Sequence, residues 1–188
     1  MIKPPKPIKC RMCGELFIKR NLHRFCSPLC LRKHTDVLSA VVKKNLDRAD
    51  TAERKEKLKN RSDYIREAQV AFNAFVRERD RNQLCICCDK PLQLEAVGGG
   101  FDCGHYRSVG SAPHLRFNEF NAHGQSKQCN RYGSGRAVDY RIGLIKRIGL
   151  QLVEALEADN LPAKLSIDDL KAIKATYRAK LKQLKAAQ

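Results

Sequence analysis

The sequence predicts an α+β protein that is mostly helical, with an N-terminal four-cysteine zinc finger and a small metal-supported core. Paired cysteines occur in two separate stretches, at residues 10–30 and 85–129. Charged segments elsewhere carry apolar residues three and four positions apart, the spacing of amphipathic helices. Residues 85–130 contain instead glycine-rich turns and a short alternating segment that is typical of a strand.

The charge of the chain favours a nucleic-acid partner. Lys and Arg number 37 against 20 Asp and Glu, which gives a formal net charge of +17 over 188 residues. The basic residues are spread along the chain rather than set opposite one apolar helix face, so a nucleic acid is favoured over an anionic membrane surface. No apolar run is long enough to cross a bilayer, and we expect no membrane partner.

The cysteine content argues against a secreted disulfide scaffold. Nine cysteines are an odd number, and the first eight residues lack the apolar core of a secretory signal. In a reducing cytoplasm, cysteines spaced in pairs are typical of thiolate metal ligands. We therefore expect zinc, one or two ions per chain.

The first zinc site is expected in residues 1–34. Two pairs about a dozen residues apart can converge on one tetrahedral ion, and Phe17 and Phe25 supply apolar support. The four expected ligands are Cys10, Cys13, Cys26 and Cys30.

A charged helical linker is expected over residues 35–62, where Gly and Pro are absent. It brings Lys43 and Lys44 near phosphates or is merely a solvated connector, and the two interpretations are equally supported. Ser62 is the expected N-cap of a following helix that reaches about residue 81.

The chain ends in a basic amphipathic helix, expected within residues 161–188. Ser166 is the predicted N-cap, and apolar residues follow at three- and four-residue intervals from Ile167 to Leu184. We expect this helix to pack on the preceding domain, with a short dimer-forming coiled coil as the alternative.

The chemistry is expected around His105, at the end of a predicted strand over residues 101–106 that follows the loop Gly98-Gly-Gly100. Hydrolysis of a phosphodiester needs an activated water and a divalent ion, and a neutral histidine is a suitable base. Asp102 is a candidate ligand for Mg²⁺ or Mn²⁺.

Several short motifs resemble known nucleases. The order of His105, Asn121 and Asn130, the last directly after Cys129, resembles the HNH (His-Me finger) nucleases. More narrowly, the chain is similar to the lambdoid phage NinG (Rap) family. The motifs that carry this similarity are Asn73-Ala-Phe-Val-Arg-Glu-Arg-Asp80, Gly104-His-Tyr-Arg107, Ala112-Pro-His-Leu-Arg-Phe-Asn-Glu119 and Cys129-Asn130.

The resemblance implies a small ββα-metal core, treble-clef-like, within residues 63–160. It implies His105 as general base, Asn121 as the residue that fixes the catalytic loop, and Asn130 with Asp102 as ligands of the catalytic ion. The implied activity is a structure-selective recombination endonuclease that cuts branched DNA, such as D-loops and Holliday junctions, in the cytoplasm of the bacterial host.

Two positions depart from the family pattern. Gly104 stands where the metal-binding acid usually precedes the histidine, so Asp102 must reach the ion from the same strand face. Ser126 stands where the second Cys-x-x-Cys pair would begin, and serine is a poor zinc ligand. The second zinc site is therefore expected to contain Cys85, Cys88 and Cys129, with Cys87, Cys103, His123 or water as fourth ligand, or with no zinc at all.

Arginines flank this region and are expected phosphate contacts: Arg107, Arg116, Arg131 and Arg136. The rival interpretation is a non-catalytic, zinc-dependent protein that binds DNA junctions as a recombination accessory. An RNA nuclease stays open because phosphate chemistry does not reveal the sugar. A homodimer would suit symmetric junction cutting, and contacts with host or phage recombination proteins are a further expectation.

Overall fold

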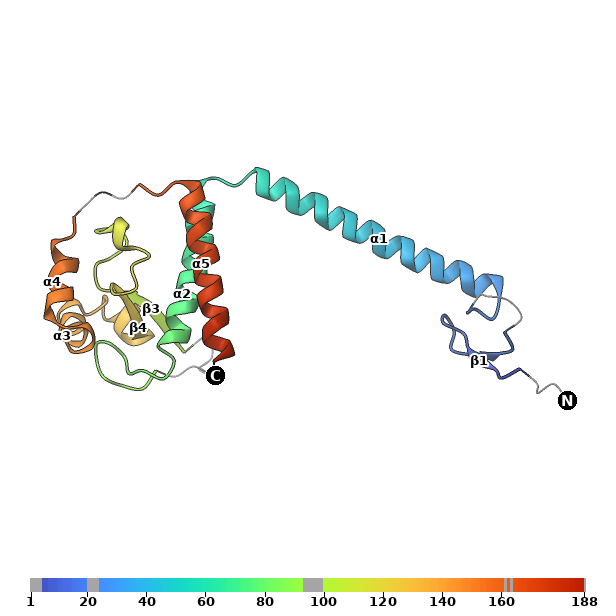
Figure 1. Ribbon diagram of the computed structural model, residues 1–188, viewed down its shortest axis with the longest axis horizontal. Helices are drawn as coiled ribbons and strands as arrows, with labels where there is room; N and C mark the ends of the chain where they lie inside the picture. The colour runs from blue at the N-terminus through green and yellow to red at the C-terminus, as the bar shows by residue number, and fades with distance from the viewer. Residues whose placement is uncertain (1–4, 20–23, 93–99, 161, 163, 188) are drawn as a thin grey trace. The chain divides into compact units, whose positions relative to one another are not determined.

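The computed structural model describes residues 5–187 except 20–23, 93–99, 161 and 163 (Figure 1). The chain divides into two compact units, residues 1–59 and 60–188. It is mostly helical, with two small antiparallel sheets and a cluster of four cysteines near the N-terminus. Across the described residues, no helix combines the length and apolarity needed to span a membrane.

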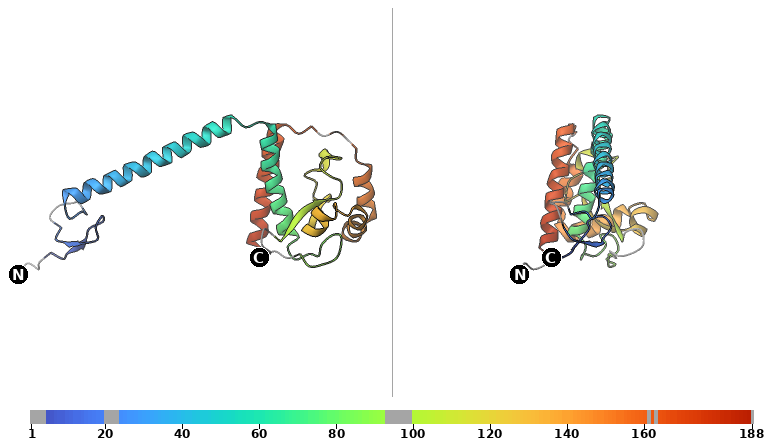
Figure 2. Two further views of the ribbon diagram at one scale, coloured as in Figure 1. Left: turned by 180° about the vertical axis from the view of Figure 1, so that it is seen from behind. Right: turned by 90° about the vertical axis from the view of Figure 1, so that its right-hand side faces the viewer.

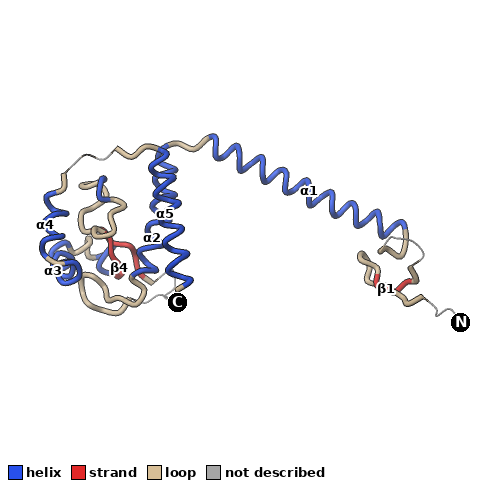
Figure 3. The backbone as a smooth tube through the Cα atoms, in the orientation of Figure 1, coloured by secondary structure: helices blue, strands red, loops and turns tan. Residues whose placement is uncertain are grey.

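The first unit consists of a two-stranded sheet and one long helix (Figure 3). Strands β1 (Ile8–Lys9) and β2 (Leu16–Phe17) pair antiparallel. Helix α1 (Pro28–Lys57) follows, and the Ser27 side chain caps it by accepting the N–H of Cys30 at 3.2 Å. None of the α1 residues is buried, so the expectation of a solvated helix is confirmed.

The second unit begins with α2 (Arg61–Arg79). Its N-cap is Asn60, whose Oδ1 accepts the N–H groups of Ser62 and Asp63, while Asp63 Oδ2 accepts the N–H of Asn60. The prediction of Ser62 as N-cap is therefore wrong. Asn60 and Asp63 satisfy two helix-end donors reciprocally, and this leaves Ser62 inside the first turn.

Helix α5 (Ile167–Ala186) lies beside α2 (Figures 1 and 2). Its predicted cap is confirmed: Ser166 Oγ accepts the N–H of Asp169, and Asp169 Oδ2 accepts the N–H of Ser166. The Tyr177 ring meets the Phe72 ring edge-on at 4.8 Å. The apolar face of α5 is thus used within its own chain, as the packing expectation required.

The central sheet pairs β3 (Phe101–His105) with β4 (Ala122–Ser126), and α2 packs against it. The strands are antiparallel, with His105 opposite Ala122 and Phe101 opposite Ser126. The 3-10 turn η1 (Pro113–Leu115) lies between them, and the π-helical turn η2 (Gln128–Tyr132) follows β4. Gly98 and Gly99 of the predicted loop lie outside the described residues.

Helices α3 (Ala137–Ile148) and α4 (Leu150–Ala158) complete the unit. Gly149 separates them with a φ of 85°, a left-handed value that favours glycine. Gly143 of α3 lies against the knuckle that carries the second cysteine group. A Cβ atom at Gly143 would stand 1.8 Å from the Ile86 carbonyl oxygen, so only glycine permits this approach.

Candidate functional site

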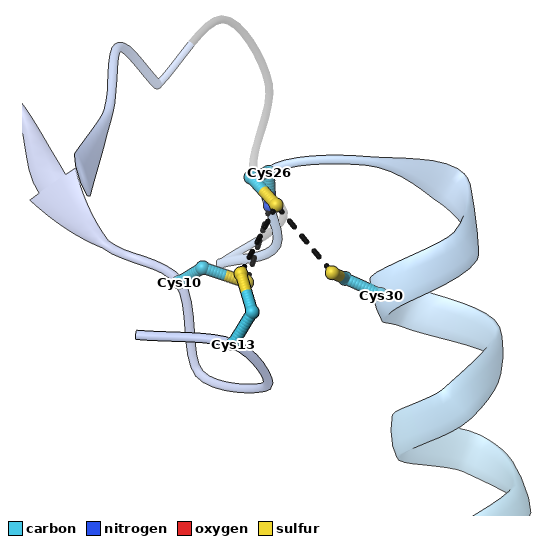
Figure 4. A group of neighbouring side chains, drawn as sticks. All are labelled: Cys10, Cys13, Cys26 and Cys30. Carbon is cyan, nitrogen blue, oxygen red and sulfur yellow. Dashed lines mark hydrogen bonds between the residues drawn. The ribbon is translucent and has the colours of Figure 1, made fainter. Parts of the chain in front are cut away.

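The four cysteines of the first unit converge (Figure 4). Their sulfur atoms all lie within 4.8 Å of one another, with Cys26 Sγ 3.5 Å from Cys13 Sγ and 3.4 Å from Cys30 Sγ. The Cys10–Gly14 turn supplies Cys10 and Cys13, the first turn of α1 supplies Cys30, and Cys26 lies two residues before that helix. This is the ligand set of a tetrahedral structural site.

Local hydrogen bonds favour thiolate at Cys10. Desolvation raises the pKa of Cys10. Hydrogen bonds from the backbone N–H groups of Cys13, Cys26 and Met12 lower it by more, so the net result is a pKa of about 6. A sulfur that is already deprotonated near neutral pH binds a metal ion without releasing a proton.

A second group of three thiols lies in the other unit. Cys85 and Cys88 come from the knuckle before the sheet, and Cys129 comes from η2. These sulfur atoms also lie within 4.8 Å of one another. The neighbouring Cys87 thiol lowers the pKa of Cys85 to about 3, with help from the Ser126 N–H at 3.3 Å.

Ser126, at the expected cysteine position, and the three protein candidates for the fourth ligand are placed differently. Ser126 lies beside the group, where its Oγ accepts the Cys129 N–H at 3.2 Å. Cys87 is held by Gln125, whose Nε2 donates to its sulfur at 2.9 Å. Cys103 packs beneath α2, where burial raises its pKa to about 12. His123 contacts Arg79 and the Phe120 carbonyl, and neither Cys103 nor His123 joins the three thiols.

His105 ends β3 with one ring nitrogen engaged. Its Nε2 lies 3.0 Å from the Arg116 carbonyl oxygen. A carbonyl oxygen only accepts, so Nε2 carries the proton and Nδ1 keeps its lone pair in the neutral ring. Burial lowers the pKa of His105, and the positive charge of Arg116 lowers it as well. The hydrogen bond to the Arg116 carbonyl raises it, but by less than burial lowers it. The imidazole is therefore neutral at neutral pH.

Asn121 fixes the loop that supplies this carbonyl. Its fully buried side chain donates from Nδ2 to the carbonyls of Arg107 and Leu115, and its Oδ1 accepts the N–H of Arg107 at 2.8 Å. Both ends of residues 107–115 are thereby tied to one amide. Arg116 follows directly, so Asn121 positions the acceptor of His105.

Asp102 and Asn130 are brought together on the strand face opposite His105. The Asn130 amide nitrogen lies 3.0 Å from Asp102 Oδ2, and Arg131 donates to both carboxylate oxygens at 2.7 and 2.9 Å. Desolvation raises the pKa of Asp102, but the hydrogen bonds from Arg131 and Asn130 lower it more. A carboxylate and an amide oxygen suit a Mg²⁺-like ion, provided that Arg131 releases the carboxylate.

The expected phosphate contacts differ in how they are used. Arg107 donates from Nη1 to the carbonyls of Leu156 and Asp159 at the end of α4, which is a structural role. Arg116 contacts Gln69, and Arg136 lies 3.5 Å from Asp139. Lys43 and Lys44 are exposed on α1.

A groove of about 400 Å³ lies beside Asp102 and Arg131, and no sequence pattern indicates it. Arg77 of α2, Lys127 and Lys185 of α5 add three cationic residues to its lining. Only the packing of α2 and α5 brings Arg77 and Lys185 together, although Arg77 lies within one of the motifs that carry the family resemblance.

Comparison with known proteins places these features in a phage family. The family model described as "Bacteriophage Lambda NinG protein" matches residues 2–187. Protein ninG of Escherichia phage lambda is 46% identical over 132 residues, 70% of this chain and 62% of that protein. Protein ninG of Salmonella phage P22 is also 46% identical, over 70% of this chain and 63% of its own length.

A longer match is to protein ninG of Enterobacteria phage H19B, 36% identical over 98% of this chain and 96% of that protein. The alignments with the lambda and P22 proteins thus span less than two thirds of those relatives, whereas the H19B alignment spans nearly all. No solved structure matches the chain.

Proposed function

The chain belongs to the bacteriophage NinG family, and from that premise we propose that it is a structure-selective DNA endonuclease with an HNH-type core. The observation that carries the proposal is the contact between His105 Nε2 and the Arg116 carbonyl, held in place by Asn121. It leaves a neutral histidine with one free basic nitrogen, as a general base requires.

In the proposed reaction, His105 Nδ1 takes a proton from a water molecule. The water oxygen attacks the phosphorus atom and the bond to the 3′ oxygen breaks. The 3′ oxygen takes a proton from solvent, so that a 5′-phosphate and a 3′-hydroxyl result. A bound Mg²⁺ or Mn²⁺ ion would neutralise charge that develops on the phosphate and the leaving oxygen. Asp102 and Asn130 would hold the ion if Arg131 turned from Asp102 to the substrate and if the twist of β3 brought the opposite strand faces of Asp102 and His105 onto one phosphate.

The order of elements supports a ββα-metal core. The hairpin of β3 and β4 carries His105 and Asp102, and η2 with the following α3 carries Asn130 directly after the thiol Cys129. We propose that zinc bound by both cysteine groups holds the finger and the knuckle, since both groups present converging thiols.

We propose DNA as substrate, and branched DNA in particular, with the bacterial cytoplasm as the place of action. The net charge of +17 supports a polyanionic substrate. The preference for branches rests on the resemblance to phage recombination nucleases alone. A homodimer and contacts with host or phage recombination proteins belong to the same proposal.

One observation favours a second candidate, a non-catalytic junction-binding accessory protein. Arg131 neutralises the carboxylate that the catalytic ion needs, and it does so through two hydrogen bonds. If Arg131 stays on Asp102 in the DNA complex, that carboxylate cannot become the expected ligand.

The two candidates separate in a cleavage assay. Four-way junctions, D-loops and linear duplexes of DNA, with matched RNA, are incubated with Mg²⁺ or Mn²⁺ and wild-type, His105→Ala or His114→Ala protein. The His114→Ala variant is the control, because His114 contacts the carbonyl of Asp159 at the end of α4. If the protein is a nuclease, wild type and His114→Ala should cleave the substrate, and His105→Ala should bind it without cleaving it. Binding without wild-type cleavage in either metal supports the accessory protein.

A further inference from the structure

The second cysteine group lies at the wall of a cavity. The cavity has a volume of about 260 Å³, and Cys88, Cys129 and Ser126 line it together with Lys90 and Arg136. A water molecule takes up roughly 30 Å³ in the liquid, so the space accepts a small molecule and not only an ion.

Among the described residues, the side chains that could complete the group have other partners or reach only one member of it. The Cys87 thiol contacts Cys85 alone of the three ligands, and its sulfur accepts a hydrogen bond from Gln125 Nε2 and lies 3.8 Å from the Gly135 carbonyl oxygen. Cys103 packs with the apolar side chains between α2 and α5. Both ring nitrogens of His123 lie 3.2 Å from other partners, Arg79 and Phe120.

Ser126 occupies the place of the missing thiol without replacing it. Its backbone N–H donates to Cys85 Sγ, and its hydroxyl oxygen accepts the N–H of Cys129. These bonds keep the turn of a cysteine knuckle. A serine hydroxyl keeps its proton near neutral pH, however, and is a poor zinc ligand.

The charge near the group suits an anionic ligand. Three thiolates exceed the charge of one zinc ion by one negative unit, and a fourth thiolate would add another. Lys90 and Arg136 line the same cavity and would offset that charge. A soft metal ion prefers sulfur, so a small thiolate is favoured over a carboxylate or a phosphate.

We propose that the second site binds zinc through Cys85, Cys88 and Cys129, with an exchangeable fourth ligand that enters through this cavity. Water occupies the position at rest. A small thiol replaces it: the thiol gives its proton to solvent, its sulfur bonds to zinc and the water leaves, with no change of oxidation state. The inference rests on the proposed metal binding by both cysteine groups and is independent of DNA cleavage.

The test uses the full chain loaded with Co²⁺, because sulfur-to-cobalt charge-transfer absorption reports bound thiolates. Metal per chain is counted first, and 2-mercaptoethanol is then added. In wild type we expect two ions per chain and an increase in absorption equal to one added thiolate. Ser126→Ala should respond as wild type does, whereas Ser126→Cys should start at the higher absorption and not respond.

A second measurement follows metal release to a chelator from the zinc-loaded protein. Loss of a hydrogen-bonding partner of a metal ligand typically costs 10–100-fold in metal affinity. Lack of a directly bonded thiolate should cost at least as much, so wild type should release one of its two ions at least about tenfold faster than Ser126→Cys. Metal release remains informative if one variant folds poorly, because wild type and Ser126→Ala should both release the second-site ion quickly.

Several results would overturn the inference. If wild type binds two ions but its absorption does not change with 2-mercaptoethanol, the protein itself supplies the fourth ligand. If Ser126→Ala then loses the second ion, that ligand is the serine. One ion per chain would mean that the second site is empty. No bound metal at all would contradict the proposed zinc binding as well, whereas lost DNA cleavage alone would leave the inference intact.

Discussion

The Nε2 atom of His105 lies 3.0 Å from the carbonyl oxygen of Arg116, and this contact decides which ring nitrogen is basic. The proton must lie on Nε2, so the lone pair lies on Nδ1. Since Asn121 holds the loop before Arg116, an amide that need not touch the substrate determines the tautomer of the proposed base. The amide is thus a positioning residue.

Replacing Asn121 by Asp should therefore impair both stability and cleavage. The carboxylate keeps an acceptor for Arg107 N–H but removes both donors to the buried carbonyls of Arg107 and Leu115. Each unsatisfied buried group costs about 1–3 kcal/mol, so urea denaturation should show a loss of at least that size. Asn118→Asp is the control, because Asn118 Oδ1 only accepts, from Phe120 and Asn121 N–H groups. Equal stability of the two variants would contradict this role.

Acid should destabilise the second unit through His123. Burial lowers the pKa of His123 to about 4, whereas the unfolded chain has its ordinary value of 6.5. Between these values the unfolded state binds a proton that the folded state does not, so the free energy of unfolding falls as pH falls. From pH 7 to pH 5 the loss should be about 2 kcal/mol, at 1.36 kcal/mol for each pKa unit.

The neighbouring Asp80 gives the comparison. Burial raises the pKa of Asp80, but its bonds to Arg79 and the Gly124 N–H lower it below 3.8. Its stabilising contribution is present above pH 3.8 and is lost only below that value. A His123→Gln variant should flatten the dependence between pH 7 and pH 5, as measured by urea denaturation at each pH. An unchanged slope would assign the effect to another group.

Gly143→Ala should destabilise the second unit. The added Cβ would meet the Ile86 carbonyl oxygen at 1.8 Å, so α3 or the cysteine knuckle must move. Overpacking of this kind costs about 1–3 kcal/mol, and the thermal midpoint should fall accordingly. Gly110→Ala is matched, because the nearest atom to its Cβ would be 3.9 Å away. Similar midpoints for both variants would show that α3 does not need this close approach.

Cys26→Ser should weaken metal binding in the first unit and loosen that unit alone. Cys26 Sγ contacts two of the other three sulfur atoms, and residues 1–59 form a compact unit of their own. During dialysis against a chelator the variant should lose the ion of the first unit faster than wild type does, and limited proteolysis should cut the first unit while residues 60–188 stay protected. Equal retention of this ion by the two proteins would speak against zinc bound by Cys26.

Local spacing explains what the sequence predicts well. The four sulfur atoms of the first group converge, because two pairs in short turns need little else to meet. The cap of α5 lies at Ser166 because the capping residues are three positions apart. Strand alternation likewise places Asp102 and His105 on opposite faces.

What the sequence does not predict depends on tertiary contacts. Arg107 reads as a phosphate contact, but the end of α4, some fifty residues later, takes its hydrogen bonds. Arg131 is also expected to contact phosphate from its sequence position, but in the structure it lies in η2 and forms an ion pair with Asp102 of β3. The sequence does not favour Asn60 over Ser62 as the cap, because both are good N-cap residues and only the reciprocal bond with Asp63 decides between them.

We propose that His105 activates the water that cuts DNA. The most direct measurement is single-turnover cleavage of an end-labelled four-way junction by wild type and His105→Ala, with the product ends mapped and binding measured in the same samples. General-base catalysis contributes about 10²–10⁴-fold, so the variant should cut slower by at least the lower figure while binding equally. The wild-type rate should rise with pH and reach its plateau at a pH below 6.5, because burial lowers the pKa of His105. Products should carry 5′-phosphates and 3′-hydroxyls. Equal rates for the two proteins, or a wild-type protein that binds the junction and never cuts it, would contradict the role of His105 as general base.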